Sequence, residues 1–385
     1  MTDNGSHSSQ PAASGAQDAS WFGHPAPLAR LFAIEMWERF GYYGMRALLM
    51  LYLTKHFVLG DRASAGIYGG YTALVYLTPL VGGLVADQYL GSKRSVKFGA
   101  ILMAIGYLAL AVGGSPSKPW AEYDGVRHPV AIAHFHDGPT SAAGEARTVQ
   151  DHGQTLAIRG REDGAIELLA PDGHVARTLP AGHMTEGSDK DPAMVALLLA
   201  ALATIAVGNG FFKPNISTMV GALYGPGDTR RDGGFTIFYM GINVGSIIGQ
   251  FLCALLADQL GWWGGFGIAG IGMLVSWVAV SFHGGRLDGL GDTPVRADGQ
   301  PHKDRAGLIY TLALLAIPAV WFLFRNLMDT PEPAAGAGIA GYLLSLPVMG
   351  KLLLGTFALA VPGILLWSWR AGSRAEFQMM LAAMV

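Results

Sequence analysis

The sequence predicts an all-α membrane protein that carries a small β-rich insert between its third and fourth membrane helices. Only 14% of the 385 residues are charged and 51% are hydrophobic, with a mean hydropathy of +0.34. Soluble domains carry roughly 25% charged residues, so this deficit separates the chain from them. Several apolar segments, such as 193–212 and 348–367, reach the ~20 residues that cross a bilayer core of about 30 Å.

The order of the predicted segments follows the alternation of apolar and polar runs. We expect the first three helices at 28–55, 65–88 and 94–113, and the next three at 193–220, 234–258 and 264–282. The predicted organisation begins with a flexible cytoplasmic tail (1–27), helices one to three (28–113), an external insert (114–191) and helices four to six (192–283). A cytoplasmic loop (284–306), a linking helical hairpin (307–370) and the truncated start of a seventh helix (371–385) follow. The two helices of the hairpin are predicted at 307–327 and 340–369.

The placement of Lys and Arg predicts the orientation in the membrane. Lys93, Arg94 and Lys97 crowd the second connection, and Arg230 and Arg231 lie in the fourth. The positive-inside rule then places these connections and the N-terminus in the cytoplasm. The first 24 residues contain no Lys or Arg and no apolar core, so they lack the features of a signal peptide. We expect a multi-pass protein of the inner (plasma) membrane.

The insert at 114–191 has the sequence character of a small β-sheet. Runs at 154–159, 165–169 and 174–179 favour strands, and Asp-Gly pairs between them favour tight turns. Six of the eleven histidines of the chain lie in this insert, including His134 and His136. Their irregular spacing and the lack of a cysteine ligand favour surface histidines over a zinc site.

The composition also excludes several function classes. The net charge of −2 and the lack of a basic patch with interleaved aromatic residues argue against a nucleic-acid partner. The chain has no nucleophile elbow, zinc-protease helix or phosphate-binding loop, so we expect neither an enzyme nor a bound cofactor or metal. The single cysteine, Cys253, allows no intrachain disulfide.

A short internal repeat favours a transporter of the inverted-repeat type. Residues 84–91 read LVADQYLG and residues 255–261 read LLADQLG. The first run follows the second predicted helix and the second run follows the fifth, so the two lie on opposite membrane faces. An inverted three-plus-three repeat of the major facilitator type produces this arrangement.

The strongest chemical signal lies in the first predicted helix, where residues 35–46 read EMWERFGYYGMR. The ionisable and aromatic side chains of this run lie along one helix face. They are Glu35, Glu38, Arg39, Tyr42, Tyr43 and Arg46. Each charge at the bilayer centre costs about 2.5–3.5 kcal/mol, so this face is expected to line a polar cavity. A structural ion pair between Glu35 and Arg39 is the alternative, but it does not explain the second glutamate and the tyrosines.

This run resembles the first-helix motif of the proton-dependent oligopeptide transporter (POT/PTR) family, which belongs to the major facilitator superfamily. Residues 208–215 (GNGFFKPN) and 235–246 (FTIFYMGINVGS) resemble two further motifs of that family, in the same order. The resemblance implies the six-helix N-terminal bundle of the superfamily. It also implies that 307–369 is the linking hairpin that bacterial members place between their two bundles. The insert at 114–191 departs from the family pattern.

The resemblance implies two groups of site residues. Proton coupling is assigned to Glu35, Glu38, Arg39 and Lys213. Substrate binding is assigned to Tyr42, Tyr43, Arg46, Tyr76, Lys213 and Asn243. Three alternatives stay open: Lys213 could snorkel towards a membrane interface, Asn243 could form only an interhelical hydrogen bond, and Tyr76 could be a packing or interfacial residue.

The connection after the second predicted helix resembles the cytoplasmic loop motif of the superfamily. Its matching residues are Gly83, Asp87, Gly91, Lys93 and Arg94. The resemblance implies that Asp87 and Arg94 form a conformational latch. Gln88 stands where a basic residue is usual, which weakens the match.

The function implied by the resemblance is a symporter that takes up di- and tripeptides across the inner membrane, with protons as the coupling ion and no cofactor. The expected partners are small peptides, the lipid bilayer and the C-terminal bundle of the same protein, which this chain lacks. A relative that carries another small anion or an amino-acid-like substrate is the first rival. A membrane receptor or assembly subunit, in which the insert binds the ligand, is the second.

Overall fold

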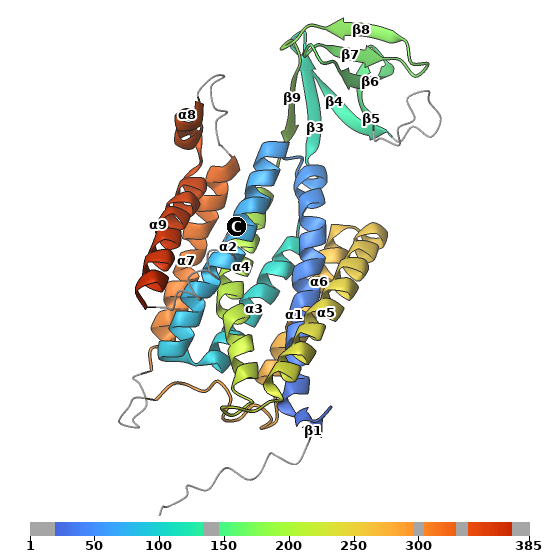
Figure 1. The fold of residues 1–385 in the computed structure, drawn as a ribbon. Coiled ribbons are helices and arrows are strands. Elements are labelled where there is room, and N and C mark those ends of the chain that lie inside the picture. Colours follow the sequence, from blue (N-terminus) through green and yellow to red (C-terminus); the bar gives the residue numbers. More distant parts are fainter. Residues whose placement is uncertain (1–19, 134–145, 296–303, 329–337, 372–385) are drawn as a thin grey trace, which may run out of the picture. The chain divides into compact units, whose positions relative to one another are not determined.

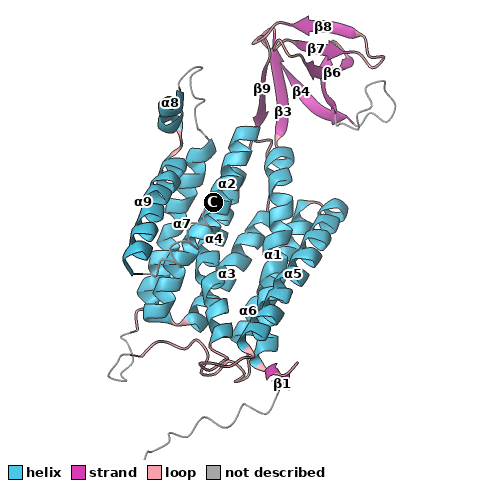
Figure 2. Ribbon diagram, viewed as in Figure 1, coloured by secondary structure: helices cyan, strands magenta, loops and turns pink. Residues whose placement is uncertain are grey.

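The computed structural model describes residues 20–133, 146–295, 304–328 and 338–371 (Figure 1). The chain forms two compact units. The helical unit comprises the residues up to 49, 65–112 and those from 198 onward, and the insert unit comprises 50–64 and 113–197. Helices dominate the first unit and strands the second (Figure 2).

Nine α-helices occur in the described ranges. They are α1 (Pro27–Leu51), α2 (Asp61–Val85), α3 (Ser92–Ala111), α4 (Pro192–Gly221), α5 (Arg231–Leu260), α6 (Trp262–Ser281), α7 (Ala306–Met328), α8 (Gly338–Ser345) and α9 (Val348–Ala371). Short π-helical turns extend α1 over Tyr52–His56 and α2 over Ala86–Leu90. Within the helical unit, α6 packs along both α3 and α5.

Six of the described helices are long and apolar enough to cross a membrane. They are α2 with its π-helical extension, α3, α4, α5, α6 and α7. Helix α1 has 25 residues but is not among these six, and its central part carries the charged side chains Glu35, Glu38 and Arg39. A bilayer leaves no water for exposed backbone groups, so helices of this length and composition are stable there because their hydrogen bonds are internal. The chain is therefore a multi-pass helical membrane protein.

The segment before α1 differs from the predicted flexible tail. Strand β1 (Ser20–Trp21) pairs antiparallel with β2 (His24–Pro25). Phe22 and Gly23 join them with positive φ values of 51° and 78°. Such angles at both central residues suit a tight hairpin turn. The described part of the predicted flexible tail (1–27) therefore contains a short hairpin directly before α1.

The helix predicted at 340–369 is also wrong in one respect, because it is broken. The axes of α8 and α9 are bent by 112°. The break falls at Leu346 and Pro347, since proline has no backbone N–H and disfavours a helical conformation at the residue before it. The N–H of Val348 at the start of α9 donates instead to the side-chain oxygen of Asn326 in α7, at 2.8 Å.

Glycines let the helices that carry the predicted site residues touch backbone to backbone. A Cβ atom added to Gly82 of α2 would lie 2.0 Å from the carbonyl oxygen of Gly210 in α4. A Cβ atom on Gly249 of α5 would lie 2.3 Å from the carbonyl oxygen of Phe40 in α1. Small residues permit such close helix packing in membranes, where no hydrophobic effect drives helices together. These contacts hold α2 against α4 and α1 against α5.

The insert unit contains a seven-stranded antiparallel sheet. Its strands are β3 (Lys118–Tyr123), β4 (Val126–Ala133), β5 (Ala146–Asp151), β6 (Gln154–Gly160), β7 (Ile166–Leu169), β8 (Val175–Leu179) and β9 (Thr185–Asp189). The spatial order β8-β7-β6-β5-β4-β3-β9 is a meander whose last strand returns to lie beside β3. One face carries a core of Ala121, Tyr123, Val130, Val149, Leu156, Leu168, Leu179 and Met184.

The three strands predicted in the insert are confirmed as β6, β7 and β8. The other four strands were not predicted, and their sequences explain why. Strand β9 reads TEGSD and has no apolar residue, and β3 contains Pro119. Pairing with neighbouring strands stabilises these segments more than their own propensity does. His134 and His136 lie outside the described residues.

We predict that the α2–α4 contact depends on the absence of a side chain at Gly82. In the full-length protein, Gly82→Ala should lower the unfolding free energy by about 1–3 kcal/mol, the typical cost of overpacking. Gly69→Ala, in the same helix, adds a Cβ with no neighbour within 4 Å and should leave stability unchanged or slightly raised. Thermal unfolding of both variants in detergent is the measurement, and equal midpoints would contradict the close approach.

Candidate functional site

The candidate site is built around three buried charged side chains of α1. The Nε atom of Arg39 donates to Oε1 of Glu35 at 2.7 Å and lies 2.9 Å from Oε2 of Glu38. Glu35 precedes Arg39 by four residues, the spacing at which helix side chains meet on one face. Glu35 and Glu38 are 1% and 0% exposed. One guanidinium thus stands between two carboxylates.

The two carboxylates are incompletely satisfied. The contact between Arg39 and Glu38 has ion-pair distance without hydrogen-bond geometry. Among the described residues, neither oxygen of Glu38 accepts a hydrogen bond, and nor does Oε2 of Glu35. Buried polar groups are nearly always hydrogen-bonded, and each exception requires an explanation. A carboxylate with unused acceptor positions can bind a proton.

Lys213 of α4 joins these residues. Its side chain is half-buried, and its Nζ atom lies 4.4 Å from the ring centroid of Tyr76 in α2. It is within electrostatic reach of Glu35, Glu38 and Arg39. We call Glu35, Glu38, Arg39 and Lys213 the charge cluster. The ammonium is held over a tyrosine of a neighbouring helix, which favours a cluster role over snorkelling towards a membrane interface.

The tyrosines of α1 extend the site along the same helix. The rings of Tyr42 and Tyr43 meet edge to face, with centroids 5.1 Å apart. The Arg39 guanidinium lies 6.0 Å from the Tyr42 ring centroid, within the range of cation–π attraction. Tyr42 is buried and Tyr43 is half-buried. The cluster therefore continues into a surface of aromatic rings and phenol hydroxyls.

Arg46 and Tyr68 form a contact that the sequence did not predict. The Nε atom of Arg46 donates to the Tyr68 hydroxyl of α2 at 2.8 Å. Tyr68 could have been noticed because α2 places tyrosines at 68, 71 and 76 among small residues. The first and last of these contact Arg46 and Lys213, so α2 contributes a tyrosine to each of the two cations.

Two predicted substrate-binding residues are exposed. Tyr76 is 62% exposed, although the Lys213 ammonium lies over its ring. Asn243 is exposed on α5, and its amide donates to the carbonyl of Tyr239 in the same helix at 3.3 Å. In the described part of the chain, Asn243 makes no interhelical hydrogen bond, and both its substrate role and the packing alternative stay predictions. The structure does not bring Asn243 into contact with the charge cluster.

The predicted pairing of Asp87 with Arg94 is wrong for this conformation. Arg94 lies 3.2 Å from Asp304, just before α7, and no ion pair joins it to Asp87 within the described ranges. Asp87 lies in the π-helical turn at Ala86–Leu90. A latch role for Asp87 and Arg94 stays a prediction.

The neighbouring Lys93 makes a closer contact. Its ammonium donates to Asp292 at 2.6 Å, and its backbone N–H donates to the carbonyl of Gly291 at 2.8 Å. The hydrogen bond from Lys93 holds the pKa of the Asp292 carboxyl below its usual range. The loop after α6 is thereby fastened to the turn between α2 and α3.

No metal site competes with this interpretation in the described ranges, where no group of three or more His, Cys, Asp or Glu side chains could hold an ion. The arrangement on α1 and α4 can instead exchange a proton and attract an anion. Two carboxylates with free acceptor positions lie beside two cations. Arg46 and the tyrosines offer donors and aromatic faces nearby.

We predict that Arg39 is required to keep the two carboxylates buried. In the full-length protein, Arg39→Gln should lower the unfolding free energy by about 3–5 kcal/mol, because it leaves buried charge uncompensated. Combining it with Glu38→Gln, which leaves one carboxylate and the Lys213 cation, should restore most of that loss. Arg30→Gln is the control and should cost about 1 kcal/mol, since the hydrogen bonds of Arg30 to described residues are to carbonyls at the end of α6. Unfolding curves in detergent that are equal for Arg39→Gln and Arg30→Gln would contradict this role.

Comparison with known proteins places the chain beside peptide transporters. Residues 93–286 match the sequence model of the POT family. The peptide transporter YePEPT of Yersinia enterocolitica is 36% identical over 263 residues, which are 67% of this chain and 36% of that protein. Dipeptide and tripeptide permease A of Cronobacter turicensis is 27% identical over 86% of this chain and 49% of its own length. The chain thus spans half or less of the length of these relatives.

Solved structures agree with the sequence comparison. A crystal structure of the peptide transporter POT in complex with sulfate is 26% identical, with a TM-score of 0.55 over 92% of this chain and 55% of that one. A mutant of the same transporter in complex with alafosfalin gives the same identity of 26% and a TM-score of 0.55.

Proposed function

The chain belongs to the POT family, and from this premise we propose that the full-length protein is a proton-coupled symporter of di- and tripeptides. The names of its relatives support peptides as the substrate class. The observation that carries the proton coupling is the incompletely satisfied pair of buried carboxylates around Arg39. Protons are the coupling ion, and no cofactor is needed.

The coupling of proton binding to peptide binding follows from the charge balance of the cluster, because net charge inside the bilayer is energetically costly. The charge cluster contains two carboxylates and two cations, so it is neutral when both glutamates are ionised. Protonation of Glu38 or Glu35 leaves one cation in excess. The carboxylate of a peptide neutralises that excess at Lys213 or Arg39. Because an uncompensated charge inside the bilayer costs several kcal/mol, proton and carboxylate bind together more favourably than either alone.

The other predicted site residues orient the bound peptide. Arg46 and Lys213 attract the C-terminal carboxylate of the peptide, while Tyr42, Tyr43, Tyr76 and Asn243 contact its backbone. Lys213 and Arg46 are only partly buried, and Tyr76 and Asn243 are exposed, which leaves these groups accessible to a ligand. A peptide backbone carries donors and acceptors that hydroxyl and amide groups can match without regard to the peptide side chains.

The exposed apolar faces support the proposed architecture of a major facilitator N-terminal bundle that requires a C-terminal partner bundle. Leu80 and Val81 of α2 are 71% and 64% exposed, and Ile247 and Phe251 of α5 are 69% and 70% exposed. Apolar surface of this extent must be covered by lipid or by other helices. We propose that the C-terminal bundle closes the peptide site along α2 and α5. The distribution of Lys and Arg favours the inner membrane with the N-terminus in the cytoplasm.

We predict that the two glutamates couple transport to protons. In proteoliposomes containing the full-length protein, Glu35→Gln and Glu38→Gln should each abolish dialanine accumulation driven by a proton gradient, because a glutamine cannot be ionised. Counterflow exchange, which needs no net proton movement, should be partly retained. Glu162→Gln, at an exposed turn of the insert, is the control and should accumulate dialanine normally. Normal acid-driven accumulation by both cluster variants would remove them from the coupling role.

Dialanine competition tests the substrate class. Uptake of labelled dialanine that is competed by other di- and tripeptides, and not by single amino acids or nitrate, is the expected result. A protein that accumulates nitrate or single amino acids and ignores dialanine would instead be a relative with another small substrate.

A further inference from the structure

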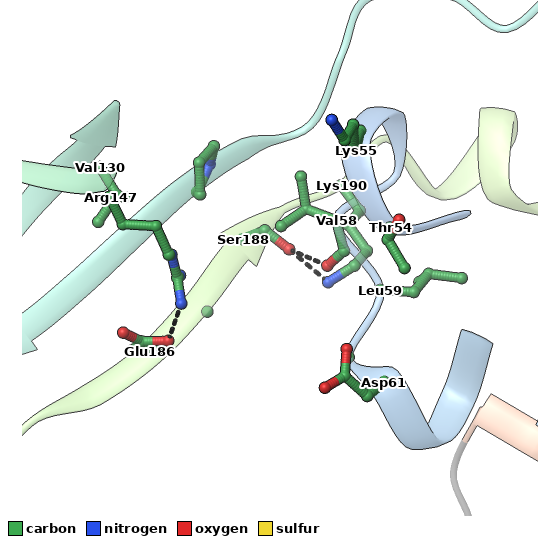
Figure 3. Close-up of a pocket in the computed structure, with 13 residues that line it drawn as sticks. Thr54, Lys55, Val58, Leu59, Asp61, Val130, Arg147, Glu186, Ser188 and Lys190 are labelled. Carbon is green, nitrogen blue, oxygen red and sulfur yellow. Dashed lines mark hydrogen bonds and ion pairs between the residues drawn. The ribbon is translucent and has the colours of Figure 1, made fainter. Parts of the chain in front are cut away.

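The insert unit contains a pocket of about 620 Å³ whose lining shares no residue with the charge cluster (Figure 3). It is lined by residues of the 54–61 segment, of strands β3, β4, β5 and β9, and by Lys190, which directly follows β9. Its charged lining residues are Lys55, Asp61, Arg147, Glu186 and Lys190. Its volume falls in the range of roughly 300–1,000 Å³ that is typical of small-molecule sites.

The strand register explains why this pocket is polar. Glu186 of β9 lies opposite Ala121 of β3, and Ala121 belongs to the apolar core of the sheet. Directly opposite residues share a face, and residues two apart do so as well. Glu186 and Ser188 therefore lie on the core face, as does Arg147, which precedes the core residue Val149 by two positions. The same face is apolar in its middle and polar at one end.

The ion pair of Arg147 with Glu186 indicates that the sheet is curled around the pocket. The two side chains approach to 2.5 Å, although β4 and β3 separate β5 from β9. Adjacent strands lie about 4.8 Å apart, so a flat sheet would place β5 and β9 some ~14 Å from each other. Curling brings them closer and makes the polar face concave. Arg147 and Glu186 neutralise each other at its wall.

Lys190 and Asp61 differ from that pair because neither forms an ion pair among the described residues, although the Asp189 carboxylate attracts the Lys190 ammonium. The Lys190 ammonium donates to the Ser188 hydroxyl at 2.5 Å, and that hydroxyl donates to the carbonyl of Val58 at 3.1 Å. Burial lowers the pKa of Lys190, so its ammonium lacks part of the hydration that would stabilise its charge. With Arg147 and Glu186 paired, the pocket presents the Lys190 ammonium and the Asp61 carboxylate, with Lys55 as a further cation in its lining, and a ligand that carries both charges would satisfy Lys190 and Asp61.

We propose that this pocket binds a short peptide as a zwitterion, with the peptide carboxylate at Lys190 and the peptide ammonium at Asp61. A simple anion such as phosphate would match Lys190 but be repelled by Asp61 and leave that carboxylate without a partner. A zwitterion matches both signs. The inference rests on the proposed function only for its choice of peptide, because the pocket residues are independent of the charge cluster. The site would be a peripheral binding site of the transporter.

The test is protection of a thiol placed in the pocket wall. In the full-length protein with Cys253→Ala and any other native cysteine replaced, Thr54→Cys supplies one reactive thiol that lines the pocket. Dialanine at about ten times its Kd should slow modification by a cationic methanethiosulfonate roughly tenfold, because few pockets then remain empty. Lys190→Gln and, as an independent variant, Asp61→Asn should each abolish the protection. Lys118→Gln, on the opposite face of β3 and outside the pocket, is the matched control and should retain it.

The outcomes separate this inference from the proposed function. Protection should persist in the Lys213→Gln background, where uptake is expected to fail. No protection in a protein that takes up dialanine would overturn the peripheral site alone, and protection without any uptake would overturn the transport proposal alone. Equal protection by inorganic phosphate or by dialanine blocked at both ends would also overturn the assignment of a zwitterion.

Discussion

Arg39 lies between the carboxylates of Glu35 and Glu38, at 2.7 and 2.9 Å, inside a bundle of otherwise apolar helices. The helices of this unit must compensate the buried charge of this arrangement. Two buried carboxylates cannot share one guanidinium without a residual negative charge, and Lys213 of α4 supplies the second cation. Every helix that contributes to the cluster must therefore be held at a defined distance from α1 or α2.

The glycine contacts hold these helices at defined distances from each other. The close approach of Gly82 to Gly210 brings α4 against α2, which places Lys213 three residues further along α4 over the Tyr76 ring. Gly249 does the same for α5 against α1, next to Phe40. Backbone contacts of this kind are less adaptable than side-chain packing, so they fix helix positions with little tolerance. Rigid helices around an incompletely satisfied charge cluster suit a site whose charge changes while its framework does not.

The sequence predicted the parts of the structure that depend on local pattern. The charged stripe of α1 could be predicted because a single ion pair between Glu35 and Arg39 does not explain a second glutamate and two tyrosines in an apolar helix. Strands β6 to β8 could be predicted because Asp-Gly turns separate their sequences. Contacts between distant segments were not predictable in the same way. Tyr68 was missed because nothing local marks it as the partner of Arg46.

Tertiary contacts also explain the errors. Asp87 and Arg94 match a motif, yet Arg94 contacts Asp304, more than 200 residues away. Strand β9 has no strand signal of its own and is stabilised by pairing with β3. The break at Pro347 could have been predicted, since proline has no backbone N–H to donate. A single helix was predicted instead because residues 340–369 are almost continuously apolar.

The central claim is that peptide binding changes the protonation of the cluster on α1. Infrared difference spectroscopy of the full-length protein, in the absorption region of protonated carboxyl groups, measures this directly when dialanine is added. We expect a peptide-induced band that disappears in Glu38→Gln or Glu35→Gln and is retained in Glu162→Gln. A band that is unchanged in both cluster variants, or no band in a protein that still accumulates dialanine with protons, would contradict the claim.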